Sequence, residues 1–371
     1  MYIDYIYLEN FRNYNNLKLK LNKSTNIFIG DNAQGKTNIL ESIYYCSIGK
    51  SHRTNKDKEL IKWDKSDCKI KINVCNNRLN KNIQVRISND GKKYININSI
   101  KINKISQLVG NLNVVMFSPE DLKIVKESPS YRRKFLNIEL CKLSKKYYYN
   151  LVQYNKVLNE RNSLLKKWNK NYNEMVDIYD NQLANFGGYV IKERYKYIKQ
   201  LNEKSNIIHK DITSGLEKVD FKYITCINNI KNPNLDFYEN LKKNRKHDFE
   251  KKTTSIGPHK DDFLININSR DSRKFASQGQ QRTLVLTIKF TALEIIKEIT
   301  GEYPVLLLDD VLSELDDNRQ KYILKSIDNI QTIITCTGFK NIENYINDKT
   351  MVYKVYSGLV KNLVDYLCKE E

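Results

Sequence analysis

The chain has 371 residues, of which 40% are hydrophobic, and a formal net charge of +20. This length predicts two compact units, or one core that carries an insertion. No apolar run approaches the ~20 residues of a membrane span, and no basic segment followed by an apolar stretch marks a secretory signal at the start. We therefore expect neither an integral membrane protein nor a secreted one.

The charge favours a polyanionic partner such as nucleic acid or an anionic membrane surface. A bias of the source genome toward Lys, Asn, Ile and Tyr is an alternative origin for the many lysines, although it does not by itself create an excess of bases over acids. The seven cysteines are scattered and form no CxxC pair. They predict reduced thiols in the cytoplasm, with neither a disulfide framework nor a zinc site.

Alternation of apolar and polar residues predicts strands over the first third of the chain. They cover residues 2–8, 17–21 and 25–29, and strand-like patterns return over 68–105. Asn89-Asp90-Gly91 between two alternating runs is typical of a hairpin turn. A helix is predicted over residues 36–47.

The middle of the chain has helical periodicity. One set of apolar residues, from Leu151 to Trp168, and another, from Val176 to Leu201, recur at close to 3.5 residues, with polar residues 169–173 between them. This pattern predicts an antiparallel helical hairpin, with two ordinary core helices as the alternative. After residue 256 the chain again has mixed α/β character, with strands at 305–308 and 332–335 and a helix near 318–327.

The most informative motif is GDNAQGKT, which fits G-x-x-x-x-G-K-[ST] between a predicted strand and a predicted helix. Its glycines let the backbone wrap around phosphate oxygens, and the helix N-terminus supplies positive potential. Lys36 can reach the β- and γ-phosphates, and the Thr37 hydroxyl can bind Mg²⁺. The predicted nucleotide-binding residues are Gly30, Asp31, Asn32, Ala33, Gln34, Gly35, Lys36 and Thr37.

Two acids follow a short apolar strand in VLLLDD, at residues 305–310. Asp309 is placed to bind Mg²⁺ through water, and Asp310 to polarise an attacking water. An acidic cap after an ordinary strand is the alternative. The two motifs together predict an ATPase in which Lys36, Asp309 and Asp310 are catalytic and Thr37 and Asp309 bind the metal.

A third motif, FASQGQQRT at residues 275–283, precedes a predicted helix over 280–299. Ser277, Gly279 and Gln280 lie at a helix N-terminus, which favours an anion; a capped helix without a ligand is the alternative. Its position before the acidic strand resembles the signature motif of ABC ATPases. There, a Ser and a Gly amide hold the γ-phosphate of a nucleotide bound to a second subunit.

The order of further motifs resembles the RecF family of ABC/SMC-like ATPases from one end of the chain to the other. These motifs are LENFRNY, the P-loop continued as TNILESIYY, GKSHR, FSPEDL, SPSYRRKFLN, GPHKDD, SQGQQRT and LLLDDVLSELD. The resemblance implies an α/β ABC-type ATPase head with an inserted helical arm. It also implies slow ATP hydrolysis, dimerisation with ATP, binding to single-stranded and gapped DNA, and action with RecO and RecR in loading RecA.

The resemblance also implies residue roles. Residues 30–37 would be Walker A, 277–281 the signature, Asp309 the Walker B ligand and 313–316 the D-loop, and Arg12 would be a basic residue near the nucleotide. Asp310 stands where many ABC ATPases have Glu. The chain departs from the pattern where Thr335 and Thr337 replace a switch His, and it has no clear Q-loop glutamine near residues 116–118.

The implied domains are a first head segment at 1–125, the arm at 126–250 and a second head segment at 251–371. Candidate DNA contacts are residues 132–134 and 242–247, while Tyr147-Tyr148-Tyr149 are candidates for base stacking or packing. GPHKDD predicts a structured turn more than a metal site.

Three other functions compete with a DNA-repair ATPase. An SMC-like chromosome ATPase needs a long coiled coil, but only about 240 positions separate Lys36 from Ser277. A transporter ATPase subunit usually places its signature nearer Walker A. A nucleotide-gated DNA-binding module with negligible turnover would share every motif and differ only in hydrolysis.

Overall fold

The computed structural model describes residues 1–77, 79–167, 172–338, 346 and 348–363. Its contacts divide the chain into unit 1, Met1–Asp121 with Lys289–Glu371, and unit 2, Leu122–Ile288. Unit 2 thus ends at Ile288, whereas the helical arm predicted from the sequence ends at residue 250. Residues 251–288, including the signature segment, lie in unit 2.

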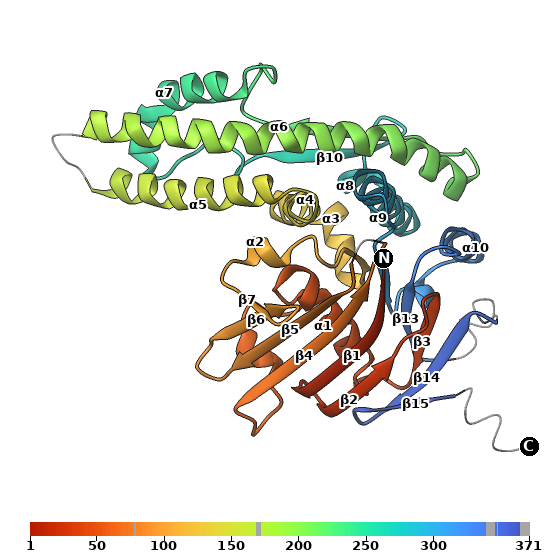
Figure 1. Ribbon diagram of the computed structural model, residues 1–371. Coiled ribbons are helices and arrows are strands. Elements are labelled where there is room, and N and C mark those ends of the chain that lie inside the picture. The colour runs from red at the N-terminus through yellow and green to blue at the C-terminus, as the bar shows by residue number, and fades with distance from the viewer. Residues whose placement is uncertain (78, 168–171, 339–345, 347, 364–371) are drawn as a thin grey trace, which may run out of the picture. The chain divides into compact units, whose positions relative to one another are not determined.

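Unit 1 contains two six-stranded sheets (Figure 1). The antiparallel sheet has the order β2-β1-β4-β5-β6-β7, and the second has the order β15-β14-β3-β13-β12-β8. The strands of the first are β1 (Tyr2–Phe11), β2 (Tyr14–Lys20), β4 (Asp67–Cys75), β5 (Lys81–Ser88), β6 (Lys93–Ile97) and β7 (Ile100–Ile102). Those of the second are β3 (Thr25–Ile29), β8 (Val114–Phe117), β12 (Val305–Asp309), β13 (Thr332–Cys336), β14 (Thr350–Tyr356) and β15 (Leu359–Asn362).

The burial of the strands explains the two sheet types. In β4, every second residue is buried, beginning with Cys68, as expected for an antiparallel sheet with one face in the core. In β3, β12 and β13 every residue is buried, and these strands pair in parallel. Parallel strands are covered on both faces and therefore have nearly continuous apolar sequences.

Helix α1 (Lys36–Ile48) packs against strands of both sheets of unit 1 (Figure 1). Ten of its thirteen residues are buried, and Ile39, Leu40 and Ile43 join one hydrophobic core with both sheets. The predicted strand 25–29 and the predicted helix near 36–47 are confirmed. The hairpin predicted at Asn89-Asp90-Gly91 connects the antiparallel pair β5 and β6.

Within the described ranges, the remaining helices of unit 1 are short, apart from the end of α9 (Gln278–Thr300), within which the division between the units falls. They are α2 (Ile105–Leu108) and α10 (Asp317–Ser326). Three 3-10 turns lie at Asp57–Leu60, Pro119–Leu122 and Leu312–Glu314. The last residue of the turn at Pro119–Leu122 belongs to unit 2. The helix predicted near 318–327 is therefore confirmed as α10.

Unit 2 is mainly helical. Its helices are α3 (Lys123–Lys126), α4 (Pro129–Leu143), α5 (Lys145–Lys166), α6 (Tyr172–Thr213), α7 (Pro233–Lys251) and α8 (Ser272–Phe275), and the first part of α9 completes it. A three-stranded antiparallel sheet has the order β11-β10-β9, formed by Arg270–Asp271, Asp262–Ile267 and Val219–Ile224.

The predicted helical hairpin corresponds to α5 and α6, which lie side by side (Figure 1). Tyr154 and Leu158 of α5, Leu183 of α6 and Phe237 of α7 share one core. Trp168 and most of the polar segment 169–173 predicted between the helices lie outside the described residues.

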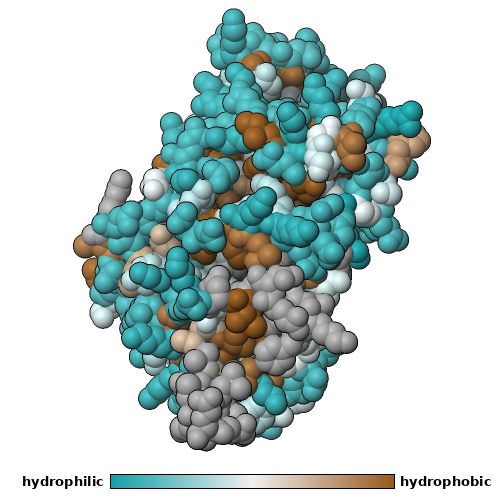
Figure 2. All heavy atoms as spheres, turned by 90° about the vertical axis from the view of Figure 1, so that its right-hand side faces the viewer, coloured by the Kyte–Doolittle hydropathy of each residue, from teal (hydrophilic) through white to brown (hydrophobic). Residues whose placement is uncertain are grey.

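The surface shown in Figure 2 is mostly hydrophilic, with small hydrophobic groups between polar side chains. No helix in the described part of the chain is long and apolar enough to cross a membrane. No disulfide joins the cysteines that fall within the described ranges, and Cys368 lies outside them.

Candidate functional site

The loop between β3 and α1 holds the lysine of the first motif. Lys36 is 6% exposed, and its ammonium group donates to the Gly30 carbonyl at 2.6 Å and to the Asp31 carbonyl at 2.9 Å. Residues Asp31, Asn32 and Ala33 on the same loop are exposed. One side of the loop is thus closed around a buried cation, and the other is open to a ligand.

Two glycines are required by this loop. A Cβ atom at Gly30 would lie 2.2 Å from the carbonyl oxygen of Val355 on β14, so only glycine allows this strand to approach. Gly35 has a φ of 117° and precedes α1, a conformation that side chains other than glycine rarely adopt. A phosphate-binding loop needs both close approach and unusual backbone angles.

Residues of the β1–β2 turn, the start of β2 and the β14–β15 turn brace the loop. Asn13 donates from Nδ2 to the Gln34 carbonyl at 2.8 Å, and the Tyr14 hydroxyl donates to the Gly35 carbonyl at 3.1 Å. The Ser357 amide donates to Gln34 Oε1 at 2.6 Å. These contacts were not predicted, because no local pattern connects turns so far apart in the sequence.

The first acid of VLLLDD lies at hydrogen-bond distance from the P-loop helix. Asp309 Oδ1 accepts from the hydroxyls of Thr37 and Thr335, both at 2.8 Å. Thr335 reaches Asp309 because β13 lies between β3 and β12. The Thr37 hydroxyl and the Asp309 carboxylate are oxygen donors that fit Mg²⁺, which is commonly held by one or two protein oxygens together with phosphates and waters.

The second acid has a strained backbone and an unsatisfied oxygen. Asp310 has a φ of 53°, a left-handed conformation that is uncommon outside glycine and often found at functional sites. Its amide donates to Thr335 Oγ1 at 3.0 Å. Its Oδ1 is buried without a hydrogen-bond partner among the described residues, so a carboxylate oxygen remains available next to the Asp309 site.

Arg12 is held beside α1 by a buried carboxylate. Its guanidinium donates to both oxygens of Glu41, at 2.9 and 2.7 Å, and to the Glu59 carbonyl at 2.8 Å. Burial alone would raise the pKa of Glu41, but hydrogen bonds from Arg12 and Ser51 outweigh it and hold that pKa below its ordinary value. Arg12 thus has a structural partner near the P-loop, and its nucleotide contact stays a prediction.

The signature segment forms the N-terminus of α9. The Gln280 amide donates to Ser277 Oγ at 3.2 Å, and the Ser277 amide donates to Gln280 Oε1 at 2.9 Å, which is the reciprocal arrangement of a capping box. Ser277 is exposed and Gly279 is half-buried. This segment belongs to unit 2, whereas Lys36 and Asp309 belong to unit 1.

The D-loop and the two positions that depart from the family pattern have local roles. Asp316 caps α10 by accepting from the Arg319 amide at 3.0 Å. Thr335, at the position expected for the switch His, donates to Asp309 Oδ1 and accepts from the Asp310 amide. After β8, where a Q-loop glutamine was sought, Asp121 accepts from the Ser118 amide at 2.8 Å and pairs with Lys289 at 2.6 Å.

Several secondary candidates are structural. Arg132 is 4% exposed and pairs with Asp262 at 2.6 Å, so its prediction as a DNA contact is wrong. In the second basic run, Arg245 pairs with Asp180 at 2.7 Å. Tyr147 is fully buried, which supports the packing alternative over base stacking.

The GPHKDD turn is a structural element. His259 Nε2 lies 3.0 Å from the Thr254 carbonyl and Nδ1 lies 2.6 Å from the Tyr154 hydroxyl. Both ring nitrogens therefore have partners, and burial lowers the pKa of His259 to about 4. No group of three or more potential metal-binding side chains occurs within the described ranges.

The chain matches known proteins over nearly its whole length. Residues 2–361 match the family described as RecF/RecN/SMC N terminal domain. The chain is 64% identical over 360 residues to the DNA replication and repair protein RecF of Clostridium novyi, covering 97% of this chain and 99% of that protein. It is 61% identical to the RecF protein of Clostridium kluyveri, covering 98% and 100%.

Solved structures agree with this relationship. The recombination mediator protein RecF, solved as RecF-ATP in the RecFOR pathway, matches with a TM-score of 0.89 and 38% identity over 97% of both chains. An Smc head domain from Pyrococcus furiosus matches with a TM-score of 0.57 at 14% identity, covering 100% of this chain and 99% of that one, which supports the shared head fold alone. By sequence, motif order and fold, the chain belongs to the RecF family of ABC/SMC-like ATPases.

Proposed function

We propose that the chain is an ATP-dependent DNA-binding protein of recombinational DNA repair and replication, with slow ATPase activity in the cytoplasm. The observation that carries this proposal is the buried Lys36 ammonium on the P-loop, with Thr37 and Asp309 at 2.8 Å from one another. Membership of the RecF family supports the DNA-repair role. The RecF proteins solved with ATP support ATP as the nucleotide.

Each residue at the P-loop has a chemical task in this proposal. The backbone of residues 30–35 cradles the phosphates, and Lys36 neutralises charge on the β- and γ-phosphates. Thr37 and Asp309 would hold Mg²⁺, which would supply positive charge to the phosphates. Asp310 orients the attacking water through its unsatisfied carboxylate oxygen. Its side chain is one methylene shorter than Glu, which suits slow turnover.

The second part of the proposal is an ATP-dependent homodimer. Ser277 is exposed and directly precedes a 23-residue helix, and a helix N-terminus favours a phosphate anion. One copy would hold ATP at its P-loop while the other copy brings Ser277, Gly279 and Gln280 to the γ-phosphate. Because ADP lacks that phosphate, it should not stabilise the dimer.

The proposed partners are single-stranded and gapped duplex DNA, RecO and RecR, and indirectly RecA, which the complex helps to load. Support for DNA comes from the net charge of +20 and from the family. Contacts to phosphates should dominate, because the sequence carries no base-reading motif such as a zinc finger.

Binding of gapped DNA and the mass of the complex, measured with ATP, with ADP and without nucleotide, test this function. We expect a dimer and the tightest DNA binding with ATP. On duplex DNA, log affinity should fall with log salt with a slope of about −0.9 per phosphate contacted. Equal binding in ATP and ADP, or no salt dependence, would contradict the proposal. Measurable turnover in single-turnover assays separates it from a binding module without hydrolysis.

A further inference from the structure

The side chain of Gln280 in the signature segment uses both ends of its amide. Its Oε1 accepts from the Ser277 amide at 2.9 Å, while its Nε2 donates to Glu217 Oε1 at 2.8 Å. Swapping the oxygen and nitrogen would break both hydrogen bonds. Glu217 therefore determines which way the Gln280 amide points, and with it the capping of α9 by Ser277.

Glu217 is itself anchored by a histidine. His209, near the C-terminal end of α6, is fully buried, and its Nε2 lies 3.2 Å from Glu217 Oε2. Its other nitrogen, Nδ1, lies 2.8 Å from the Thr287 hydroxyl on α9. Apart from their contact with each other, His209 Nε2 and Glu217 Oε2 have no hydrogen-bond partner among the described residues.

The contact between His209 and Glu217 depends on a proton between them. The Thr287 oxygen lies 2.9 Å from the Thr283 carbonyl, so this hydroxyl either donates there and accepts from Nδ1–H of His209, or turns to donate to Nδ1. Nε2 and Oε2 then attract each other only if one proton lies between them. Because His209 is buried, this contact holds the Glu217 carboxylate in a single position.

We propose that Glu217 is a positioning residue for the signature: through Gln280 it sets the Ser277 cap, and through His209 it connects the end of α6 to that cap. This inference rests on the proposed role of the signature at the γ-phosphate. Loss of Glu217 would leave Gln280 free to rotate and Ser277 poorly placed. Binding of ATP at the P-loop of the same chain would be unaffected.

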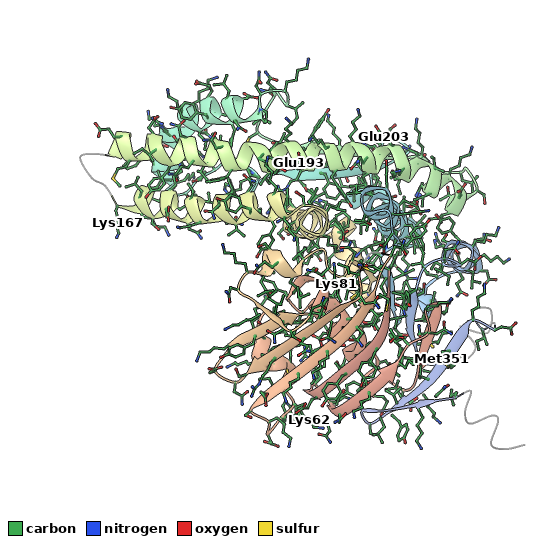
Figure 3. The ribbon with its side chains drawn as sticks, viewed as in Figure 1. Lys62, Lys81, Lys167, Glu193, Glu203 and Met351 are labelled. Atoms are coloured by element: carbon green, nitrogen blue, oxygen red, sulfur yellow. The ribbon has the colours of Figure 1, made fainter. Side chains whose placement is uncertain are left out.

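Three variants separate a hydrogen-bonding role from a structural one. Glu217→Ala should reduce the turnover number by about ten- to a hundredfold, the range expected when a hydrogen bond to a charged group is lost, with monomeric ATP affinity unchanged. Glu217→Gln keeps an oxygen for Gln280 and offers an N–H₂ group to His209, so it should restore most of the activity. Glu203→Ala is the control, because Glu203 lies exposed on α6 and pairs only loosely with Lys199, at 3.9 Å (Figure 3).

Mixed dimers provide a readout that a general folding defect would not give. Glu217→Ala mixed with Lys36→Ala should regain activity, because one site pairs an intact P-loop with an intact signature. Glu217→Ala mixed with Ser277→Arg should not, because both signatures are defective.

Three results would each overturn the inference. The first is wild-type turnover in Glu217→Ala, and the second is an equal loss of turnover in Glu217→Gln and Glu217→Ala. The third is recovery of activity when Glu217→Ala is mixed with Ser277→Arg. Mixing Lys36→Ala with Ser277→Arg is the reference. If that pair lacks activity although mixed dimers form, the proposed arrangement of the signature fails independently of Glu217.

Discussion

Lys36 and Ser277 each stand at the beginning of a helix, α1 and α9, but their surroundings differ. Lys36 is 6% exposed and bonded to its own loop, and two distant turns brace that loop. Ser277 is exposed, and Phe275 beside it is 68% exposed. Residues of the same chain surround the start of α1, whereas the start of α9 is exposed to solvent.

In the proposed homodimer, the open helix end is the one that a second copy would complete. A phosphate bound at the P-loop would meet a preformed backbone, a buried cation and the Asp309 carboxylate within one unit. At the signature, the internal contacts to Gln280 fix the shape of the segment, but its outer side has no cover. We therefore expect substitutions at the two helices to have separable effects.

Lys36→Ala should have the largest effect. Removing a charge-assisted contact to phosphate from a buried site should cost about 2 kcal/mol or more, or at least about a thirtyfold loss of ATP affinity. Dimerisation and hydrolysis should be lost with it. Nucleotide titration measures the affinity, and Lys50→Ala, an exposed residue after the other end of α1, is the matched control. Wild-type ATP affinity in Lys36→Ala would show that the P-loop reading is wrong.

Ser277→Arg should have a narrower effect. The bulky side chain should block the approach of a second copy, so ATP-dependent dimers and hydrolysis should disappear. Affinity for ATP in the monomer should stay within about twofold, since the proposed role of Ser277 is at a nucleotide held by another copy. Sedimentation with ATP and nucleotide titration give the two values. Parallel loss of both would mean that the substitution damages the fold.

Thr335→Val should have the smallest effect of the three. It removes the hydroxyl that donates to Asp309 Oδ1 and accepts from the Asp310 amide. The loss of about one hydrogen bond should slow hydrolysis about tenfold while ATP binding persists. Thr332→Val is the control, because Thr332 is also fully buried on β13 and its hydroxyl donates to the Ile330 carbonyl near its own position. Equal rates of hydrolysis in the two variants would show that the Thr335 hydroxyl does not contribute to hydrolysis.

Local features of the fold could be predicted from the sequence. The strand at 25–29 and the helix beginning at Lys36 were predicted because a buried apolar run, a glycine-rich loop and a helical stretch lie next to one another. The hairpin at Gly91 followed from its turn residues. These patterns involve residues close together in the sequence, so they can be recognised without knowledge of the tertiary structure.

Contacts between distant segments could not be predicted. Arg132 belongs to a basic run, and nothing in that run reveals its half-buried partner Asp262, 130 residues away. The roles of Asn13 and Thr335 depend on which strands become neighbours in the two sheets. Glu217 lies outside every recognised motif, and only the packing of α6 near α9 brings it to the signature.

The most direct test of the central claim, that the signature acts on a nucleotide held by another copy, is the ATPase activity of a mixture of Lys36→Ala and Ser277→Arg. Each mixed dimer keeps one site with an intact P-loop and an intact signature. We predict that the mixture regains up to about half the activity of each wild-type dimer that it replaces, although each variant alone is inactive. Absence of activity, with mixed dimers shown to form, would contradict the claim.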